Sequence, residues 1–175
     1  MEKFYLSNEQ LLLDSFRLAR MVWDSKWKPD VMIALWRGGT PVGLAVHEFF
    51  EYAGWNVRHM AMKTASYTGI GSRQEARLEF AREVLEAGGG ADKVLVVDDV
   101  LDSGGTMRAV LDGLQRAAEV RSAVLYWKPS ADKYNVTPNY HVNVLEQWIV
   151  FPHELQGLTR AEVAEKSPEI AGLIP

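Results

Sequence analysis

Apolar residues recur along the chain in two patterns, a helical spacing near the start and short unbroken runs further on. Ser7 and Gln10 fit a capping box ahead of the helical pattern, so we expect a helix over residues 8–24. The short apolar runs predict strands, and the segments between them predict two more helices. The expected strands are 31–35, 55–62, 93–97, 122–127 and 140–144, and the expected later helices are about 41–53 and 105–118.

The alternation of strands and helices predicts an α/β domain with a mainly parallel sheet flanked by helices. Such sheets bind their ligands beyond the carboxyl ends of the strands. Arg37, Asp98 and Lys128 each come directly after an expected strand, so we expect them to share one rim of the sheet. Residues 64–78 are polar and have no clear period, which is typical of a long binding loop or lid.

The most informative segment runs from Val94 to Met107 and reads VLVVDDVLDSGGTM. Its strand is expected to end in the neighbouring carboxylates Asp98 and Asp99, with Asp102 three residues later. Neighbouring carboxylates repel each other, so a divalent metal or sugar hydroxyls should accompany them. The glycine-rich turn that follows opens a helix, whose first backbone N–H groups are free to bind a phosphate. The pattern therefore indicates a site for a sugar phosphate.

Length, composition and charge limit the remaining possibilities. With 175 residues, 47% of them hydrophobic, the chain can form a single domain over residues 1–175. It has no cysteine, so no disulfide and no thiolate metal site is expected. The net charge of −4 argues against nucleic acid as a partner. The chain shows neither a signal peptide pattern nor an apolar run that could span a bilayer, so we expect a cytoplasmic protein without a membrane partner.

The segment Val96–Thr106 resembles the phosphoribosyl pyrophosphate (PRPP) motif of the type I phosphoribosyltransferases. Four further segments make the chain similar to the members of that family that act on 6-oxopurines, namely hypoxanthine, guanine and xanthine. They are Trp36–Gly39 for the pyrophosphate loop, Ser66–Tyr67 for the flexible catalytic loop, Lys128–Pro129 for the base-reading lysine, and Trp148–Ile149 for the ring that stacks on the purine. The resemblance implies the type I phosphoribosyltransferase fold, with a small hood at about 129–158 over the base site.

The resemblance also implies an enzyme of purine salvage, which transfers the 5-phosphoribosyl group from PRPP to a 6-oxopurine and releases pyrophosphate and a nucleoside monophosphate. The implied cofactor is Mg²⁺ with Asp99 as its metal contact, and the implied catalytic residue is Asp102. The implied PRPP-binding residues are Arg37, Gly38, Gly39, Ser66, Tyr67, Asp98, Asp99, Ser103, Gly104, Gly105 and Thr106. The implied base-binding residues are Lys128, Trp148 and Ile149. A homo-oligomer, either a dimer or a tetramer, is implied as well.

Two alternative functions stay open at this point. A regulatory protein could use the same pocket to sense PRPP, although it would not need Asp102 and would usually carry a DNA-binding domain or a basic surface. A phosphoribosyltransferase for uracil, orotate or adenine is the other alternative, against which Lys128 and Trp148 argue. The preferred 6-oxopurine is also open, because the three bases differ only at the purine 2-position, which main-chain carbonyls often read.

Overall fold

In the computed structural model, three stretches of the chain are described: residues 3–63, 93–114 and 119–175. The chain divides into two compact units, which are residues 12–146, and residues 1–11 with 147–175. The segment predicted as the hood, 129–158, is shared between the two units. The single domain over the whole chain stays a prediction. None of the helices in the three described stretches is long and apolar enough to cross a membrane.

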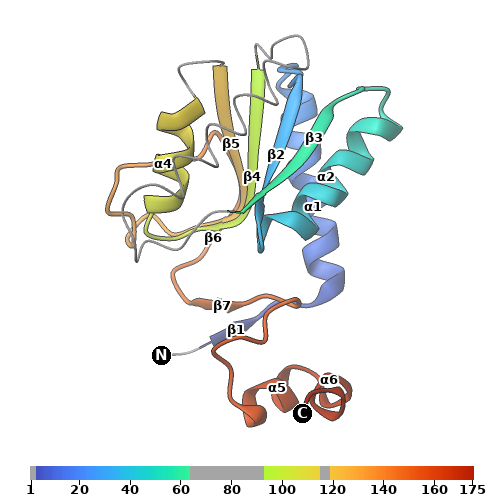
Figure 1. The fold of residues 1–175 in the computed structure, drawn as a ribbon, viewed down its shortest axis with the longest axis vertical. Helices are drawn as coiled ribbons and strands as arrows, with labels where there is room; N and C mark the ends of the chain where they lie inside the picture. The colour runs from blue at the N-terminus through green and yellow to red at the C-terminus, as the bar shows by residue number, and fades with distance from the viewer. Residues whose placement is uncertain (1–2, 64–92, 115–118) are drawn as a thin grey trace. The chain divides into compact units, whose positions relative to one another are not determined.

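The larger unit is built on a five-stranded, entirely parallel sheet with the strand order β3-β2-β4-β5-β6. Helices cover both faces, with α1 and α2 on one and α4 on the other (Figure 1). The strands are β2 (Val31–Trp36), β3 (Arg58–Lys63), β4 (Lys93–Leu101), β5 (Glu119–Trp127) and β6 (Tyr140–Val144), and the helices are α1 (Asn8–Asp24), α2 (Gly39–Tyr52) and α4 (Gly105–Leu114). The predicted α/β class with a mainly parallel sheet is confirmed.

Both faces of β2 are covered, which explains its unbroken apolar run. The face toward α4 shares one core cluster with that helix, which includes Val31, Ile33, Leu35, Met107, Val110 and Leu114. The opposite face lies against α2, where a Cβ atom added to Gly43 would come 2.6 Å from the Cβ atom of Ala34. A glycine at this position therefore lets α2 approach the sheet closely.

Strand β4 is longer than its sequence predicts. It pairs with β2 only as far as Ala34 opposite Val97, whereas its pairing with β5 continues to Leu101. The prediction that the strand ends at Val97 is wrong, because β5 holds Asp98 and Asp99 in extended backbone. As a result, β2 no longer borders β4 at the position where the two carboxylates begin.

The other predicted elements are found with small shifts at their ends. Helix α1 has the predicted bounds, but β3 begins three residues later than predicted. The reason is that the Trp55 N–H donates to the Phe50 carbonyl at 2.8 Å, and the Trp55 ring packs on Trp23 with centroids 4.4 Å apart. The loop predicted at 64–78 and the predicted last turn of the helix at 115–118 lie outside the described residues.

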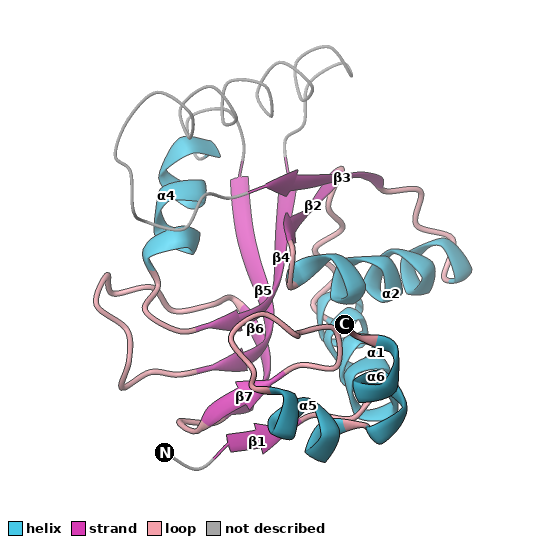
Figure 2. Ribbon diagram, turned by 60° about the horizontal axis from the view of Figure 1, so that its bottom comes forward, coloured by secondary structure: helices cyan, strands magenta, loops and turns pink. Residues whose placement is uncertain are grey.

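The smaller unit contains a two-stranded parallel sheet and two short helices (Figure 2). Strand β1 (Lys3–Tyr5) pairs with β7 (Trp148–Val150), so segments from opposite ends of the sequence lie side by side. Helix α5 (Arg160–Lys166) begins with a capping box formed by Thr159 and Glu162, and α6 (Pro168–Leu173) follows it. The elements β1, β7 and α6 were not predicted, because they are too short for a period to be recognised.

Candidate functional site

Asp98 and Asp99 lie at the carboxyl end of β4, in the centre of the sheet. Only 7% of the Asp99 surface is exposed. The Asp99 N–H donates to Asp98 Oδ1 at 3.0 Å, and the Val100 N–H donates to Asp99 Oδ1 at 2.8 Å. Burial, and then repulsion from Asp99, hold the pKa of Asp98 well above its ordinary value. The pair therefore forms a site where a cation or hydroxyl donors would be strongly favoured.

The loop between β2 and α2 approaches these carboxylates so closely that only glycine fits. A Cβ atom on Gly38 would overlap the Asp99 carboxylate, and one on Gly39 would overlap the Val97 carbonyl and come 2.9 Å from Asp98 Cα. The Gly39 N–H also donates to the Asp98 carboxylate. The absence of side chains at both positions lets the backbone serve as the wall of the site.

Arg37 stands at the start of this loop, next to the half-exposed Trp36. The peptide bond between Trp36 and Arg37 is cis. The Arg37 carbonyl accepts the Thr40 N–H at 3.1 Å and the Thr40 hydroxyl at 2.6 Å, which closes the first turn of α2. The Arg37 side chain is exposed at the rim of the sheet. A cation there complements the carboxylates and would suit an anionic ligand.

The segment Ser103–Thr106 forms the turn into α4 at the same rim. Gly104 has φ of +83°, which an L side chain rarely adopts, so a glycine is required there. Its carbonyl accepts the Arg108 N–H at 2.9 Å, which starts the helical hydrogen bonding. The N–H groups of the first turn have no partner within the helix and carry the positive end of its dipole. The turn therefore offers donors to an anion such as a phosphate.

Lys128 follows the end of β5, and only 6% of its surface is exposed. Its N–H donates to the Leu101 carbonyl at 3.0 Å, which extends the pairing of β4 and β5 by one residue. Its ammonium group lies 3.6 Å from Asp102 Oδ2, and about half of the Asp102 side chain is exposed. The structure thus joins a buried cation to a carboxylate that is open to solvent.

Sequence analysis missed this pairing, since 26 positions separate the two residues and only the strand register aligns them. It also missed the segment that follows Lys128, in which the Lys133 N–H donates to the Ser103 carbonyl at 2.9 Å. The nearest signal in the sequence is Asp132, because aspartate often closes a turn through its own side chain.

Four predicted site residues cannot be joined to this arrangement. Ser66 and Tyr67 lie outside the described residues. Trp148 and Ile149 belong to β7 in the smaller unit, where Trp148 is 46% exposed and Ile149 is buried. Their contact with a base stays a prediction.

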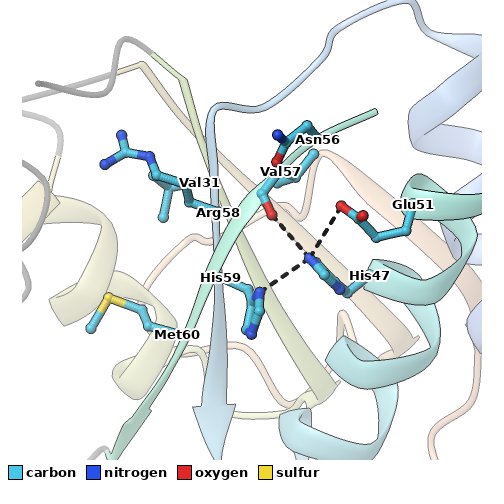
Figure 3. A pocket seen from close by; sticks show the side chains of 8 residues that line it. All are labelled: Val31, His47, Glu51, Asn56, Val57, Arg58, His59 and Met60. Atoms are coloured by element: carbon cyan, nitrogen blue, oxygen red, sulfur yellow. Dashed lines mark hydrogen bonds and ion pairs between the residues drawn. The ribbon is translucent and has the colours of Figure 1, made fainter. Parts of the chain in front are cut away.

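A pocket of about 530 Å³ lies between the end of α2 and the start of β3 (Figure 3). His47 Nε2 lies 2.9 Å from the Val57 carbonyl oxygen, 3.1 Å from His59 Nδ1 and 3.8 Å from Glu51 Oε1. Because a carbonyl only accepts, we assign the proton to His47 Nε2, with His59 Nδ1 as a second acceptor. The strand β3 starts at this pocket, whereas the carboxylates lie toward the carboxyl end of β4, and the two strands run parallel in the same sheet. The pocket therefore lies at the opposite end of the sheet from the candidate site.

Comparisons with known proteins give one consistent family. The model of the phosphoribosyl transferase domain matches residues 3–156. A purine phosphoribosyltransferase from Pyrococcus horikoshii is 26% identical in sequence, with a TM-score of 0.67 over 91% of this chain and 99% of its own. No curated protein sequence matches the chain significantly.

Two further solved structures share the fold. One is a hypothetical protein from Neisseria gonorrhoeae with bound ppGpp, 23% identical with a TM-score of 0.71 over 96% of this chain and 97% of that one. The other is the xanthine-guanine-hypoxanthine phosphoribosyltransferase of Helicobacter pylori, 22% identical with a TM-score of 0.60 over 86% and 92%. The family model covers most of the chain and includes the whole of the candidate site. The chain therefore belongs to the phosphoribosyl transferase domain family.

Proposed function

We propose that this protein transfers the 5-phosphoribosyl group of PRPP to a 6-oxopurine, namely hypoxanthine, guanine or xanthine, in purine salvage. The bond from ribose C1 to the diphosphate breaks, a bond from C1 to a purine nitrogen forms, and a proton leaves the imidazole ring of the base. The products are pyrophosphate and a nucleoside monophosphate. Family membership and the similarity to a purine phosphoribosyltransferase at 26% identity support the proposal.

The choice of a 6-oxopurine as the acceptor rests on one observation, the ion pair of Lys128 Nζ with Asp102 Oδ2 at 3.6 Å. The 6-oxygen and N7 lie on one edge of a 6-oxopurine, where the oxygen accepts a hydrogen bond. A protonated N7 next to it donates one. Lys128 supplies the donor for the oxygen and Asp102 supplies the acceptor for N7–H. A 6-aminopurine such as adenine presents a donor in place of the oxygen, and the Lys128 ammonium would then face another donor.

The other subsites are assigned to PRPP by their chemistry. The turn Ser103–Thr106 would hold the 5′-phosphate through backbone N–H groups, helped by the hydroxyls at its two ends. Asp98 and Asp99 would accept hydrogen bonds from the ribose hydroxyls. Arg37 and the N–H groups of Gly38 and Gly39 would bind the diphosphate and stabilise the charge that develops on it as the bond breaks.

The carboxylate pair also fits the magnesium ion that this family implies. Among the described residues, no three His, Cys, Asp or Glu side chains are grouped so as to hold a metal by themselves. Magnesium is commonly held by one or two carboxylates together with substrate phosphates. Two neighbouring carboxylates at the carboxyl end of β4 match that requirement, and Asp99 is the proposed contact. When bound, magnesium would neutralise charge on the leaving diphosphate.

Asp102 would accept the proton of the imidazole ring, or hold it in place at N7 while the new bond forms. Trp148 and Ile149 are proposed to stack on the base, and Ser66 and Tyr67 to contact the diphosphate. We also propose that the protein assembles as a dimer or tetramer, which sedimentation velocity would test.

The proposal is tested by incubating the protein with PRPP, Mg²⁺ and each base in turn, and following pyrophosphate release. Turnover is expected with hypoxanthine, guanine or xanthine but not with adenine, uracil or orotate. Turnover with adenine, uracil or orotate, and with no 6-oxopurine, would show that the acceptor is not a 6-oxopurine.

A PRPP sensor is the second candidate, and the ppGpp in the Neisseria gonorrhoeae structure is the observation that favours it. Tight PRPP binding without turnover on any base would support the sensor. Competition between ppGpp and PRPP in a binding assay would then identify the regulating ligand.

A further inference from the structure

The segment that follows Lys128 folds back onto the turn into α4. The Lys133 N–H donates to the Ser103 carbonyl at 2.9 Å. The Asp132 carboxylate packs directly on Gly104, because a Cβ atom there would come 2.5 Å from Asp132 Oδ1. Val136 also borders Gly104, with its Cγ2 atom 3.5 Å from that Cβ position. The backbone proposed to hold the 5′-phosphate is therefore in direct contact with residues 132–136.

Asp132 makes this segment rigid through its own hydrogen bonds. Its Oδ1 accepts the Tyr134 N–H at 2.9 Å, and its Oδ2 accepts the Val136 N–H at 2.7 Å. Asn135 between them has φ of +54°, a conformation that asparagine tolerates better than most residues. One carboxylate accepts both N–H groups, which would otherwise need water as their acceptor, and so closes a tight turn.

The turn closed by Asp132 is anchored at both ends. Val136 is buried in the core cluster beneath α4. At the other end, the Ala131 N–H donates to the Lys128 carbonyl at 3.1 Å. A single short segment therefore connects the core, the proposed base-reading lysine and the proposed phosphate turn.

We propose that Asp132 is a positioning residue, which holds the turn 103–106 in the conformation that binds the 5′-phosphate of PRPP. The inference rests on the proposed function, since it assigns that turn to the phosphate. Two adjacent glycines give the turn more conformational freedom than other residues would, and ordering it on binding costs free energy. A rigid support removes part of that cost before the ligand arrives.

The direction in which phosphate binding changes on substitution of Asp132 distinguishes a positioning role from an electrostatic role. Asp132 is negative and lies beside a turn that would bind an anion, so removal of its charge alone should strengthen phosphate binding. Asp132→Asn removes the charge and also puts an NH₂ group opposite an N–H that the carboxylate now accepts. Positioning therefore predicts weaker binding in the variant, and an electrostatic role predicts tighter binding.

The test compares Asp132→Asn with Asp112→Asn by calorimetric titration of PRPP in the presence of Mg²⁺. Asp112 is a matched control, because it is an exposed carboxylate of α4 that pairs only with Arg108 in the described contacts, at 3.1 Å. We expect the Kd for PRPP to rise roughly tenfold in Asp132→Asn, as for one lost hydrogen bond to a charged group. Asp112→Asn should bind as the wild type does.

Steady-state kinetics add a readout that a general loss of structure would not produce. The KM for PRPP should rise in Asp132→Asn while the KM for the purine stays at the wild-type value. Wild-type or tighter PRPP binding by the variant would overturn the inference, as would an equal rise in both KM values. Should Asp132→Asn fail to fold, Asp132→Ser replaces it, because a serine hydroxyl still accepts one N–H of the turn.

A titration with inorganic phosphate keeps the two proposals distinguishable. It probes the turn without any base and without turnover. If the wild type binds phosphate and Asp132→Asn binds it more weakly, the inference stands even when no purine is a substrate. If purines turn over but both proteins bind phosphate and PRPP equally, the proposed function stands and the inference fails.

Discussion

At the scale of single residues, the pairing of Lys128 with Asp102 meets two requirements, a partner for a buried cation and a carboxylate accessible to a ligand. A lysine that is 6% exposed needs a partner for its charge, because an unpaired charge is costly to bury. Asp102 meets that need and remains about half exposed, so it stays accessible to a ligand. The same carboxylate can therefore stabilise the buried cation in the free protein and face the imidazole ring in the complex.

Replacement of Asp102 by Asn tests its role in proton transfer. An amide cannot accept the proton, so kcat is expected to fall roughly 10²-fold or more. The KM for PRPP should change little, because the proposed PRPP contacts are made by other residues. Steady-state rates of pyrophosphate release measure both, with Asp112→Asn as the control. A wild-type kcat in Asp102→Asn would remove Asp102 from the mechanism.

Gly38→Ala tests the close approach of the β2–α2 loop to the carboxylates. The new methyl group would overlap the Asp99 carboxylate, so the loop or the carboxylate must shift. We expect a loss of about 1–3 kcal/mol in the free energy of unfolding, as in other overpacked sites. The kcat/KM for PRPP should fall as well.

Gly172→Ala is the control for this substitution, because a Cβ atom at Gly172 meets nothing within 4 Å. Urea unfolding and steady-state kinetics are measured on both variants. The interpretation of the loop would be wrong if the two variants behaved alike.

At the scale of elements, the larger unit was largely predictable because most of its strands contain short apolar runs and its helices have apolar residues at helical spacing. The extension of β4 was not, since Asp98 and Asp99 look like turn residues and only the pairing with β5 keeps them extended. Strands β1 and β7 were missed because they are short and come from opposite ends of the chain.

The candidate site likewise contains residues that were predictable from local sequence and contacts that were not. The carboxylates and the glycines of the turn into α4 were identifiable from one continuous segment. The contacts of Lys128 with Asp102 and of Asp132 with Gly104 depend on distant parts of the chain that only folding brings together. Sequence alone therefore identified the residues proposed to touch substrate better than the residues proposed to position them.

The capping box of α5 makes the smaller unit sensitive to acid. A hydrogen bond from Lys3, followed by those from the Thr159 N–H and hydroxyl, lowers the pKa of Glu162 to about 2 from its ordinary 4.5. A carboxylate with a lowered pKa stabilises the folded state above its unfolded pKa. This stabilisation is therefore complete above about pH 4.5 and is lost as the pH falls toward 2.

Glu162→Gln should remove this part of the pH dependence. We expect the Tm of the wild type to fall more steeply than that of the variant when the pH is lowered from about 5 to about 2.5. Glu165→Gln, on the same helix, should keep the wild-type slope. Parallel Tm curves for the wild type and Glu162→Gln would contradict the assignment.

At the scale of the whole molecule, ligand binding and stability are linked. A ligand that binds only the folded chain at 100 times its Kd adds about 2.7 kcal/mol to the free energy of unfolding. For a chain of this size that corresponds to a rise in Tm of roughly 5–10 °C. We expect this rise with PRPP and Mg²⁺ together, and a much smaller one with ribose 5-phosphate, which lacks the diphosphate.

Differential scanning fluorimetry over a range of PRPP concentrations measures this effect. Asp99→Asn should reduce the shift, because it weakens the proposed contacts to ribose and magnesium. A Tm that does not respond to PRPP at any concentration would contradict the assignment of the site.

The strand order β3-β2-β4-β5-β6 has a consequence for where a ligand can bind at all. The chain winds outward from β2 to β3 and then returns to the other side of β2 to form β4. The connections that leave β2 and β4 therefore depart toward opposite faces, into α2 and α4, and separate above the sheet. Such a reversal of winding opens a crevice through the backbone topology alone, whatever side chains line it. Substitutions in the two loops can thus change what the crevice binds, while the strand pairing beneath it stays intact.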